Sequence, residues 1–211
     1  MGRPEPTAEE RQARRDELLD AAVDAIRSHG PQVSMEELAK KAGVTKPILY
    51  RHFGHRDGLT AALASRFVAG LQETLQSAMA SGNAPRETLE KTIDAYLAFV
   101  ERDPDVYRFL VRRLIASPPE DELSVGNFLR QVANQVAVVL GEQLRAAHVD
   151  SGGAEPLAHG IVGMVHAAGD WWLERRTMPR ERVVQYVVDL LWGGMEAGLA
   201  PGTTNQGGRG S

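Results

Sequence analysis

The chain has 211 residues, enough to bury a substantial core in one large domain or two small ones. Hydrophobic residues make up 43% and charged residues 25% of the sequence, as in an ordinary soluble globular protein, and the formal net charge of −4 excludes a polycation. The absence of cysteine excludes disulfides and thiolate chemistry. No apolar run reaches the roughly 18 residues of a membrane helix and the N-terminus is polar, so we expect no membrane span, no signal peptide and a cytoplasmic location.

The first predicted helix follows a proline-broken segment, residues 1–7, which we expect to be flexible. Thr7 and Glu10 form a capping-box pair, which is a signature of a helix start. Apolar residues then keep a helical period up to Gly30: Leu18, Leu19, Ala22, Val23 and Ile26. Three arginines near the start of this helix, Arg11, Arg14 and Arg15, are either contacts to an anionic partner or a solvated charged face.

Residues 33–59 predict two short helices joined by a tight turn, and then the start of a further helix. Ser34 and Glu37 form a second capping box. Gly43 ends the first short helix, because glycine adopts a left-handed conformation without strain. Thr45 caps the second short helix, and Pro47 falls early enough in its first turn to be tolerated.

The apolar spacing of this stretch is that of a helix-turn-helix, in which small and apolar residues fix the angle between the two helices. The residues that set the spacing are Ala39, Gly43, Val44 and Leu49. Residues 38–66 also hold six Lys or Arg against one acid, Asp57. DNA affinity comes largely from neutralised phosphates, so the pattern favours DNA binding over the alternative, a plain antiparallel helix pair.

The rest of the chain predicts further helices and no strand of note. We expect helices at about 57–81, 85–103, 105–116, 122–148, 154–176 and 180–198, separated by loops rich in proline, glycine and serine. The expected fold is therefore all-α with about nine helices. Residues 8–56 form a DNA-binding head, residues 57–199 form a helical body, and residues 200–211 form a second flexible tail.

The stretch AGVTKPILYRHF, residues 42–53, and the following GHRDGL, residues 54–59, resemble the recognition helix and the next turn of the TetR family of bacterial transcriptional regulators. The resemblance is specific over residues 10–60. Arg56 stands where the family usually has a lysine that clamps the DNA backbone, which keeps the charge but changes the donor geometry. Gly58 stands where a glutamate is common, and we expect it to weaken the first turn of its helix.

The resemblance implies DNA contacts, residue by residue. The implied phosphate contacts are Ser34, Tyr50, His52 and Arg56, and the implied contacts to bases or the flanking backbone are Thr45, Lys46 and Pro47. It further implies that the helix at 57–81 transmits ligand binding from the body to the head.

Aromatic and apolar residues of the body are candidates to line a cavity between helices, where ligand sites are mostly apolar with a few polar anchors. The candidate ligand-binding residues are Tyr96, Phe99, Tyr107, Phe109, Phe128, Val132, Met164, His166 and Trp171. Taken singly, each is more readily explained by core packing, and only the resemblance gives the group its weight as an effector site. A largely apolar set favours a lipophilic effector.

A polar series lies along one face of the predicted helix at 154–176, because its members are 4, 7 and 4 residues apart: Glu155, His159, His166 and Asp170. It is a polar seam in an interface or at a pocket edge, or else its histidines orient a ligand. A metal site lacks an obvious completing ligand. We expect no cofactor and no metal.

The helix at 180–198 is apolar on several faces and must be covered on more than one side. A two-fold interface through the last two helices is the economical cover, and a homodimer also suits a palindromic operator. The leading hypothesis is a dimeric transcriptional regulator, a repressor, that a small effector releases from DNA. The alternatives are a DNA-binding regulator or activator without an effector, and an all-helical enzyme or carrier. The enzyme would need convergent acid–base residues, and only the polar series at 154–176 offers any.

Overall fold

The computed structural model describes residues 7–115, 125–146, 148 and 150–199, although the side chains of 112–115, 125, 128 and 197–199 lie outside the description. Within these ranges the chain forms nine α-helices, one short 3-10 helix and no strand, which confirms the all-α prediction. The helices are α1 (Ala8–His29), α2 (Met35–Lys41), α3 (Lys46–Phe53), α4 (Arg56–Ser81), α5 (Pro85–Arg102), α6 (Pro104–Ile115), α7 (Val125–Ala146), η1 (Ser151–Gly153), α8 (Ala154–Arg175) and α9 (Arg180–Leu199).

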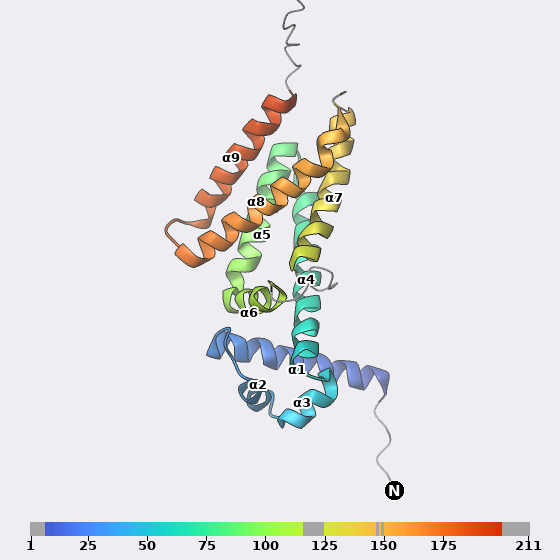
Figure 1. Ribbon diagram of the computed structural model, residues 1–211, viewed down its shortest axis with the longest axis vertical. Coiled ribbons are helices and arrows are strands. Elements are labelled where there is room, and N and C mark those ends of the chain that lie inside the picture. Colours follow the sequence, from blue (N-terminus) through green and yellow to red (C-terminus); the bar gives the residue numbers. More distant parts are fainter. Residues whose placement is uncertain (1–6, 116–124, 147, 149, 200–211) are drawn as a thin grey trace, which may run out of the picture.

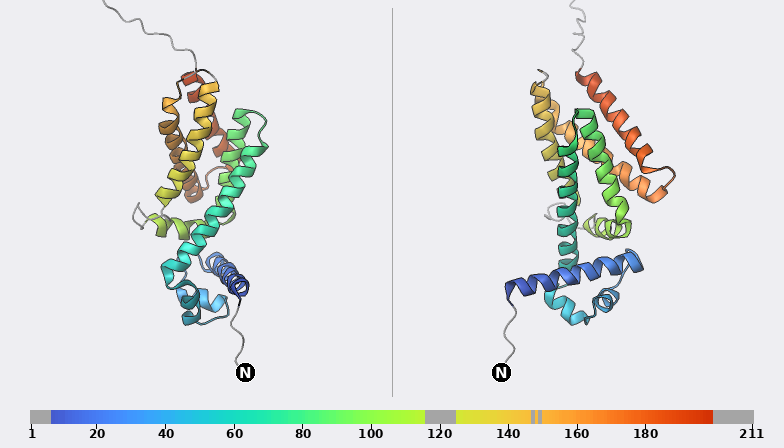
Figure 2. Two further views of the ribbon diagram at one scale, coloured as in Figure 1. Left: turned by 90° about the vertical axis from the view of Figure 1, so that its right-hand side faces the viewer. Right: turned by 180° about the vertical axis from the view of Figure 1, so that it is seen from behind.

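The helices form a head and a body (Figure 1). The head consists of α1, α2, α3 and the start of α4, and α5 to α9 gather around the remainder of α4. The side views show α4 running as one rod from the head into the body (Figure 2). None of the helices in the described ranges is long and apolar enough to cross a membrane.

Local capping explains where the head helices begin. Thr7 and Ser34 both accept a hydrogen bond from the backbone three residues on, and the glutamate at that position returns the bond, so both predicted capping boxes are confirmed. Gly43 follows α2 with φ +64°, as predicted for the turn. Thr45 occupies the N-cap position of α3, but its side chain makes no capping bond, so the predicted side-chain cap is wrong.

The turn from α3 to α4 is tight and is built on glycine. Gly54 adopts φ +76°, and a Cβ on Gly58 would lie 1.9 Å from the carbonyl oxygen of Phe53. The N–H of Gly58 donates to His55 Nδ1 at 3.3 Å, which caps the start of α4. Glycine is therefore required at position 58, because the backbone of Phe53 leaves no room for a Cβ. The sequence had predicted only that Gly58 weakens this helix turn.

Two buried clusters form the core. The first joins the head helices to one face of α6, through Val106, Phe109 and Leu110. The second lies between α5, α8 and α9 and includes Tyr107 of the same helix α6. The half-buried Phe67 of α4 packs against both clusters. Helices α4 and α6 therefore belong to both cores and connect the head to the body.

The C-terminal helices pack on one another and on α5. Helix α7 packs along α8, and α9 packs mainly on α5. Trp172 of α8 is 1% exposed, and its indole N–H donates to the carbonyl oxygen of Met178 at 2.8 Å, which fixes the turn between α8 and α9. Arg180 at the start of α9 pairs with Asp94 and Glu101 of α5, at 2.8 and 2.7 Å.

Candidate nucleic-acid interface and effector site

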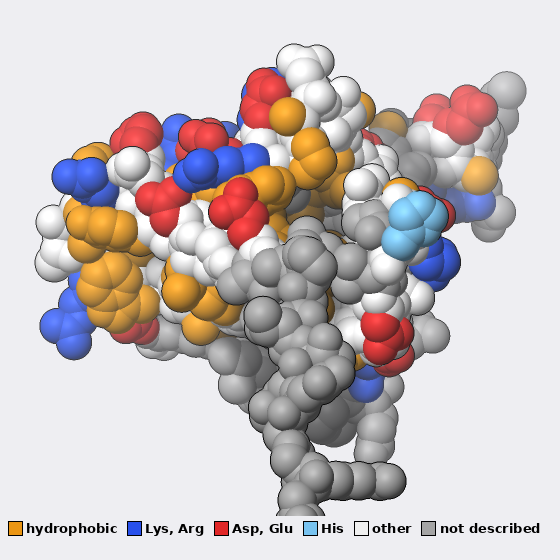
Figure 3. All heavy atoms as spheres, turned by 90° about the horizontal axis from the view of Figure 1, so that it is seen from above, with side chains coloured by type: hydrophobic (Ala, Val, Ile, Leu, Met, Phe, Trp, Pro, Cys, Tyr) orange, Lys and Arg blue, Asp and Glu red, His pale blue; other side chains and the backbone are white. Residues whose placement is uncertain are grey.

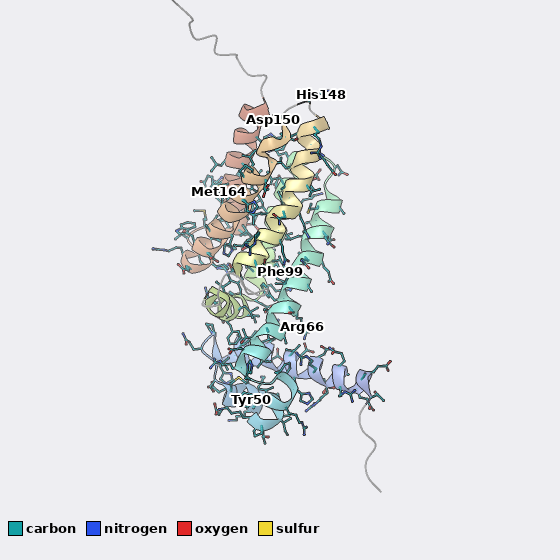
Figure 4. The ribbon with its side chains drawn as sticks, turned by 45° about the vertical axis from the view of Figure 1, so that its right-hand side comes forward. Tyr50, Arg66, Phe99, His148, Asp150 and Met164 are labelled. Carbon is teal, nitrogen blue, oxygen red and sulfur yellow. The ribbon has the colours of Figure 1, made fainter. Side chains whose placement is uncertain are left out.

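Helix α3 has a buried face and an outward face. Leu49 and Phe53 hold it in the head core, whereas the residues at its start and on its other side are exposed or half-buried. The outward set is Thr45, Lys46, Pro47, Tyr50, Arg51 and His52. Figure 4 labels Tyr50 at the end of the molecule opposite the body. The structure thus brings five of the seven predicted DNA contacts onto one short helix and its cap.

Lys46 is tied to α2 across the turn. Its Nζ donates to Glu36 Oε1 at 2.5 Å and lies 5.9 Å from the centre of the Tyr50 ring. The hydrogen bond to Glu36 raises the pKa of Lys46 and lowers that of Glu36, so both groups stay charged. Contact with DNA therefore requires Lys46 to exchange Glu36 for a phosphate or a base edge.

Ser34 and Arg56 flank this helix, and both side chains have partners within the protein. The Ser34 hydroxyl donates to Glu37 Oε2 at 2.8 Å. The hydrogen bond from the Ser34 backbone N–H lowers the pKa of Glu37, and the bond from the hydroxyl lowers it further. Arg56 Nη2 donates to the carbonyl oxygen of Val33 at 3.1 Å, and its Nε is buried without a hydrogen-bond partner. The phosphate contacts of Ser34 and Arg56 stay predictions that need these bonds rearranged or shared.

His52 lies among arginines near the end of α3. Partial burial lowers its pKa, and the positive charges of Arg51, Arg14 and Arg15 lower it further. A neutral imidazole at neutral pH still donates one N–H, so a phosphate contact is compatible with this environment. A phosphate beside the ring would favour its charged form.

A polar cluster lies within the body, between α5, α6 and α8. The Tyr96 hydroxyl lies 3.1 Å from His166 Nδ1, and the Tyr107 hydroxyl donates to Asp170. His166 Nε2 lies 3.5 Å from Asp170 Oδ2. Burial raises the pKa of both tyrosines, and for Tyr107 the neighbouring Tyr96 and Asp170 raise it further. The phenols therefore stay protonated and act as hydrogen-bonding groups.

The remaining candidate effector residues divide between several places. Phe99 is buried in the second core and meets Phe67 edge-on with ring centres 4.9 Å apart. Met164 of α8 is half-buried against the second core (Figure 4). Val132 is half-buried on α7, and the side chain of Phe128 lies outside the described residues.

Two candidates lie away from the polar cluster. Phe109 is 1% exposed in the first core and packs with the head, because α6 turns that face toward α1. Trp171 is 45% exposed on the outer face of α8, and the adjacent Trp172 takes the buried place. The structure thus places Phe109 in the core beside the head and Trp171 at the surface, and their contact with an effector stays a prediction.

The polar series on α8 is also divided. His166 and Asp170 join the two tyrosines, whereas Glu155 and His159 are exposed, and His159 Nδ1 bonds the carbonyl oxygen of Glu155 at 3.0 Å. Asp170 was absent from the predicted effector set. Its position four residues after His166 was the sequence signal for this pair, because residues four apart on a helix are neighbours. Among the described residues, no group of three or more His, Asp or Glu side chains is arranged to hold a metal.

Comparison with known proteins identifies the family. Residues 18–63 match the model for bacterial regulatory proteins of the tetR family, and residues 74–208 match the tetracyclin repressor-like C-terminal domain. The chain belongs to the TetR family of helix-turn-helix transcriptional regulators.

Relatives share most of their length with this chain. An uncharacterised HTH-type transcriptional regulator of Mycobacterium tuberculosis is 33% identical over 180 residues, which cover 85% of this chain and 76% of that protein. The transcriptional activator FasR of Mycolicibacterium smegmatis is 27% identical over 187 residues, which cover 88% of this chain and 84% of FasR.

Solved structures share the fold. A TetR-family regulator of Pectobacterium atrosepticum superposes with a TM-score of 0.71 at 23% identity, covering 93% of this chain and 99% of that one. The regulator FadR of Bacillus subtilis, in complex with stearoyl-CoA, superposes with a TM-score of 0.67 at 18% identity, covering 85% and 98%.

Proposed function

We propose that this TetR-family regulator binds a palindromic operator as a homodimer and is released from it by a small lipophilic effector bound in the body. The observation that carries the proposal is the double attachment of α6. Val106, Phe109 and Leu110 pack with the head, whereas Tyr107 of the same helix bonds the polar cluster. A ligand that displaces Tyr107 acts directly on a helix that supports the head.

The DNA-binding part of the proposal places α3 in the major groove. Thr45, Lys46 and Pro47 at its start would meet base edges or the flanking backbone, and Tyr50 and His52 would meet phosphates. In a two-fold dimer the two α3 helices reach half-sites roughly 34 Å apart, or a multiple of that distance.

Exposed apolar side chains on the last two helices support a homodimer. Leu157 and Trp171 on α8, and Tyr186 and Leu190 on α9, are each at least 45% exposed. Seen from above, hydrophobic side chains gather at the left of the molecule, where α9 and the C-terminal end of α8 lie in Figure 1 (Figure 3). A second copy would cover these faces, because two-fold dimers are the commonest homo-oligomers.

The effector class follows from what surrounds the polar cluster. Tyr96 and Tyr107 share the second core with Phe67, Phe99 and Met164, and the ring centres of Phe67 and Tyr107 lie 6.2 Å apart. An apolar body with one polar group fits this neighbourhood. FadR bound to stearoyl-CoA supplies an acyl precedent within the same fold. The effector releases DNA only to the extent that it prefers the dimer form with low DNA affinity.

Activation is the second candidate for the direction of regulation, because the relative FasR is a transcriptional activator. A transcription assay on a promoter that carries the operator distinguishes the two. A repressor lowers transcript yield when it is added without effector, whereas an activator raises it.

The DNA-binding proposal is tested by selecting duplexes from a random pool with the purified protein and measuring affinity for the selected duplex. Tyr50→Ala should weaken that binding while a native mass spectrum still shows a dimer. Equal binding by Tyr50→Ala and the parent protein at matched salt would show that the assigned recognition face is wrong.

The effector site is tested with stearoyl-CoA as the probe and with two histidines of α8. His166→Ala removes a member of the polar cluster and should weaken binding of the probe, whereas His159→Ala changes an exposed histidine on the same helix and should not. Equal binding to both variants would place the effector elsewhere. No binding of the probe to the parent would remove the acyl class and favour a regulator without such an effector.

A further inference from the structure

Arg15 lies on α1, but its side chain contacts the C-terminal end of α3. Its Nη1 donates to the carbonyl oxygen of His52 at 2.6 Å, and its guanidinium carbon lies 4.5 Å from the centre of the Phe53 ring. The two contacted residues are the last two of α3, 37 and 38 positions further along the chain. The side chain is half-buried. Arg15 therefore bridges the first helix of the head and the end of the helix that carries the predicted DNA contacts.

The chemistry of a helix end explains why a cation lies there. The last carbonyl groups of an α-helix have no partner within the helix and carry a partial negative charge. Gly54, with φ +76°, turns the chain away and donates its N–H back to Tyr50 at 2.6 Å. Arg15 supplies a charged donor for the carbonyl of His52, two residues after Tyr50, and its guanidinium also lies over the Phe53 ring.

The neighbouring Arg14 differs in every one of these respects. Its Nη1 pairs with Glu17 on its own helix at 2.7 Å, and its side chain is 45% exposed. The sequence gives both arginines the same two interpretations, an anion contact or a solvated charge. The structure separates them, because only Arg15 of this pair hydrogen-bonds α3.

We propose that Arg15 is a positioning residue for DNA recognition, which fixes the end of α3 against α1 and thereby sets the angle at which α3 meets the major groove. The inference rests on the proposed function of α3 as the recognition helix. It assigns to Arg15 no phosphate of its own. A residue of this kind determines how well one sequence is preferred over others, whereas a phosphate contact strengthens binding to all sequences alike.

Lysine separates the two roles, because it keeps the charge. A lysine ammonium cannot reproduce the planar guanidinium that both stacks on Phe53 and donates in a fixed direction to His52. Arg15→Lys would thus preserve a phosphate contact in large part but would loosen a positioned helix end. Arg14→Lys is the matched control, since it makes the same change one residue away on the same helix.

The experiment compares the parent, Arg15→Lys, Arg15→Gln, Arg14→Lys and Arg14→Gln on two duplexes, one selected from a random pool by the parent and one scrambled version of it. We expect both Arg15 variants to lower the ratio of selected to scrambled affinity by roughly tenfold for each half-site, which corresponds to one lost charge-assisted hydrogen bond in each protomer. We expect the Arg14 variants to keep the parent ratio. All affinities are measured well below the melting temperature of each variant.

Suppose that Arg15→Lys keeps the parent ratio, and that Arg15→Gln weakens both duplexes equally and lowers the salt slope by about 0.9 for each protomer bound. Arg15 is then a phosphate contact and the inference is overturned. If the parent selects no duplex, the proposed function fails instead. Amide hydrogen exchange of the DNA-free protein gives a second readout: residues 52–56 should exchange faster in Arg15→Lys than in Arg14→Lys, and equal exchange would contradict the inference.

Discussion

Gly58 offers a test in which two physical effects predict opposite signs. Gly58 lies in the first turn of α4, where replacement by alanine normally stabilises a helix by about 0.5–1 kcal/mol. At this position, however, the added Cβ would lie 1.9 Å from the carbonyl oxygen of Phe53 and 3.1 Å from its carbonyl carbon. Both are backbone atoms, so the turn between α3 and α4 must move.

The steric term should outweigh the propensity term. Forcing an extra carbon into a packed site costs about 1–3 kcal/mol, so we expect Gly58→Ala to lower the free energy of unfolding by about 1–2 kcal/mol. Gly70 is the control in the same helix, because its added Cβ would lie 3.6 Å from the Phe99 ring, an ordinary contact. Gly70→Ala should leave stability unchanged or raise it by up to about 1 kcal/mol.

Urea unfolding followed by circular dichroism at one protomer concentration measures both changes, and an unchanged slope shows that the midpoint reports stability. A rise in stability for Gly58→Ala would refute the close approach of Phe53 and Gly58. Since this turn also sets the end of α3, we further expect Gly58→Ala to weaken DNA binding more than Gly70→Ala does.

Three further predictions concern charge and burial. The pKa of His52 is lowered in the DNA-free protein and a phosphate would raise it, so DNA affinity should increase as the pH falls from 8 to about 6. Fluorescence-anisotropy titrations measure this pH dependence, and His52→Gln should remove it. The hydrogen bond from Arg27 holds the pKa of Asp103 below its ordinary 3.8, so this pair stabilises the fold above about pH 4 and the stabilisation is lost as the pH falls. Asp103→Asn should therefore lower the free energy of unfolding by about 1 kcal/mol at pH 7 and make that free energy depend less on pH in acid. Trp172→Ala should lower the unfolding free energy by about 3–5 kcal/mol, because its side chain is buried. Trp171→Ala should leave protomer packing intact and weaken the dimer in sedimentation analysis. Comparable losses of stability in the two variants would contradict the different burial of the two tryptophans.

Local signals predicted the head well. The capping boxes of Thr7 and Ser34 and the glycine turn after α2 are short-range features that depend on a few neighbouring residues, and the structure confirms them. The order and limits of the body helices also follow from helical periodicity and from proline and glycine breaks.

Contacts between residues far apart in the chain could not be predicted from local sequence patterns. Trp171 and Trp172 are adjacent on a helix that is apolar on more than one side, so periodicity alone did not show which one is buried. Phe109 faces the head because α6 lies between two cores, and no local pattern records that arrangement. The sequence also did not show where a charged side chain points. Arg15 and Arg56 lie among basic residues, yet both hydrogen-bond backbone carbonyls within the head.

The most direct test of the proposed switch is a fluorescence-anisotropy titration of the protein on its selected duplex with stearoyl-CoA, run beside a native mass spectrum of the same mixture. We expect the duplex to be released over the concentration range in which the mass of the dimer increases by that of bound stearoyl-CoA. A duplex that stays fully bound while the dimer carries stearoyl-CoA would contradict the coupling of body and head through α6.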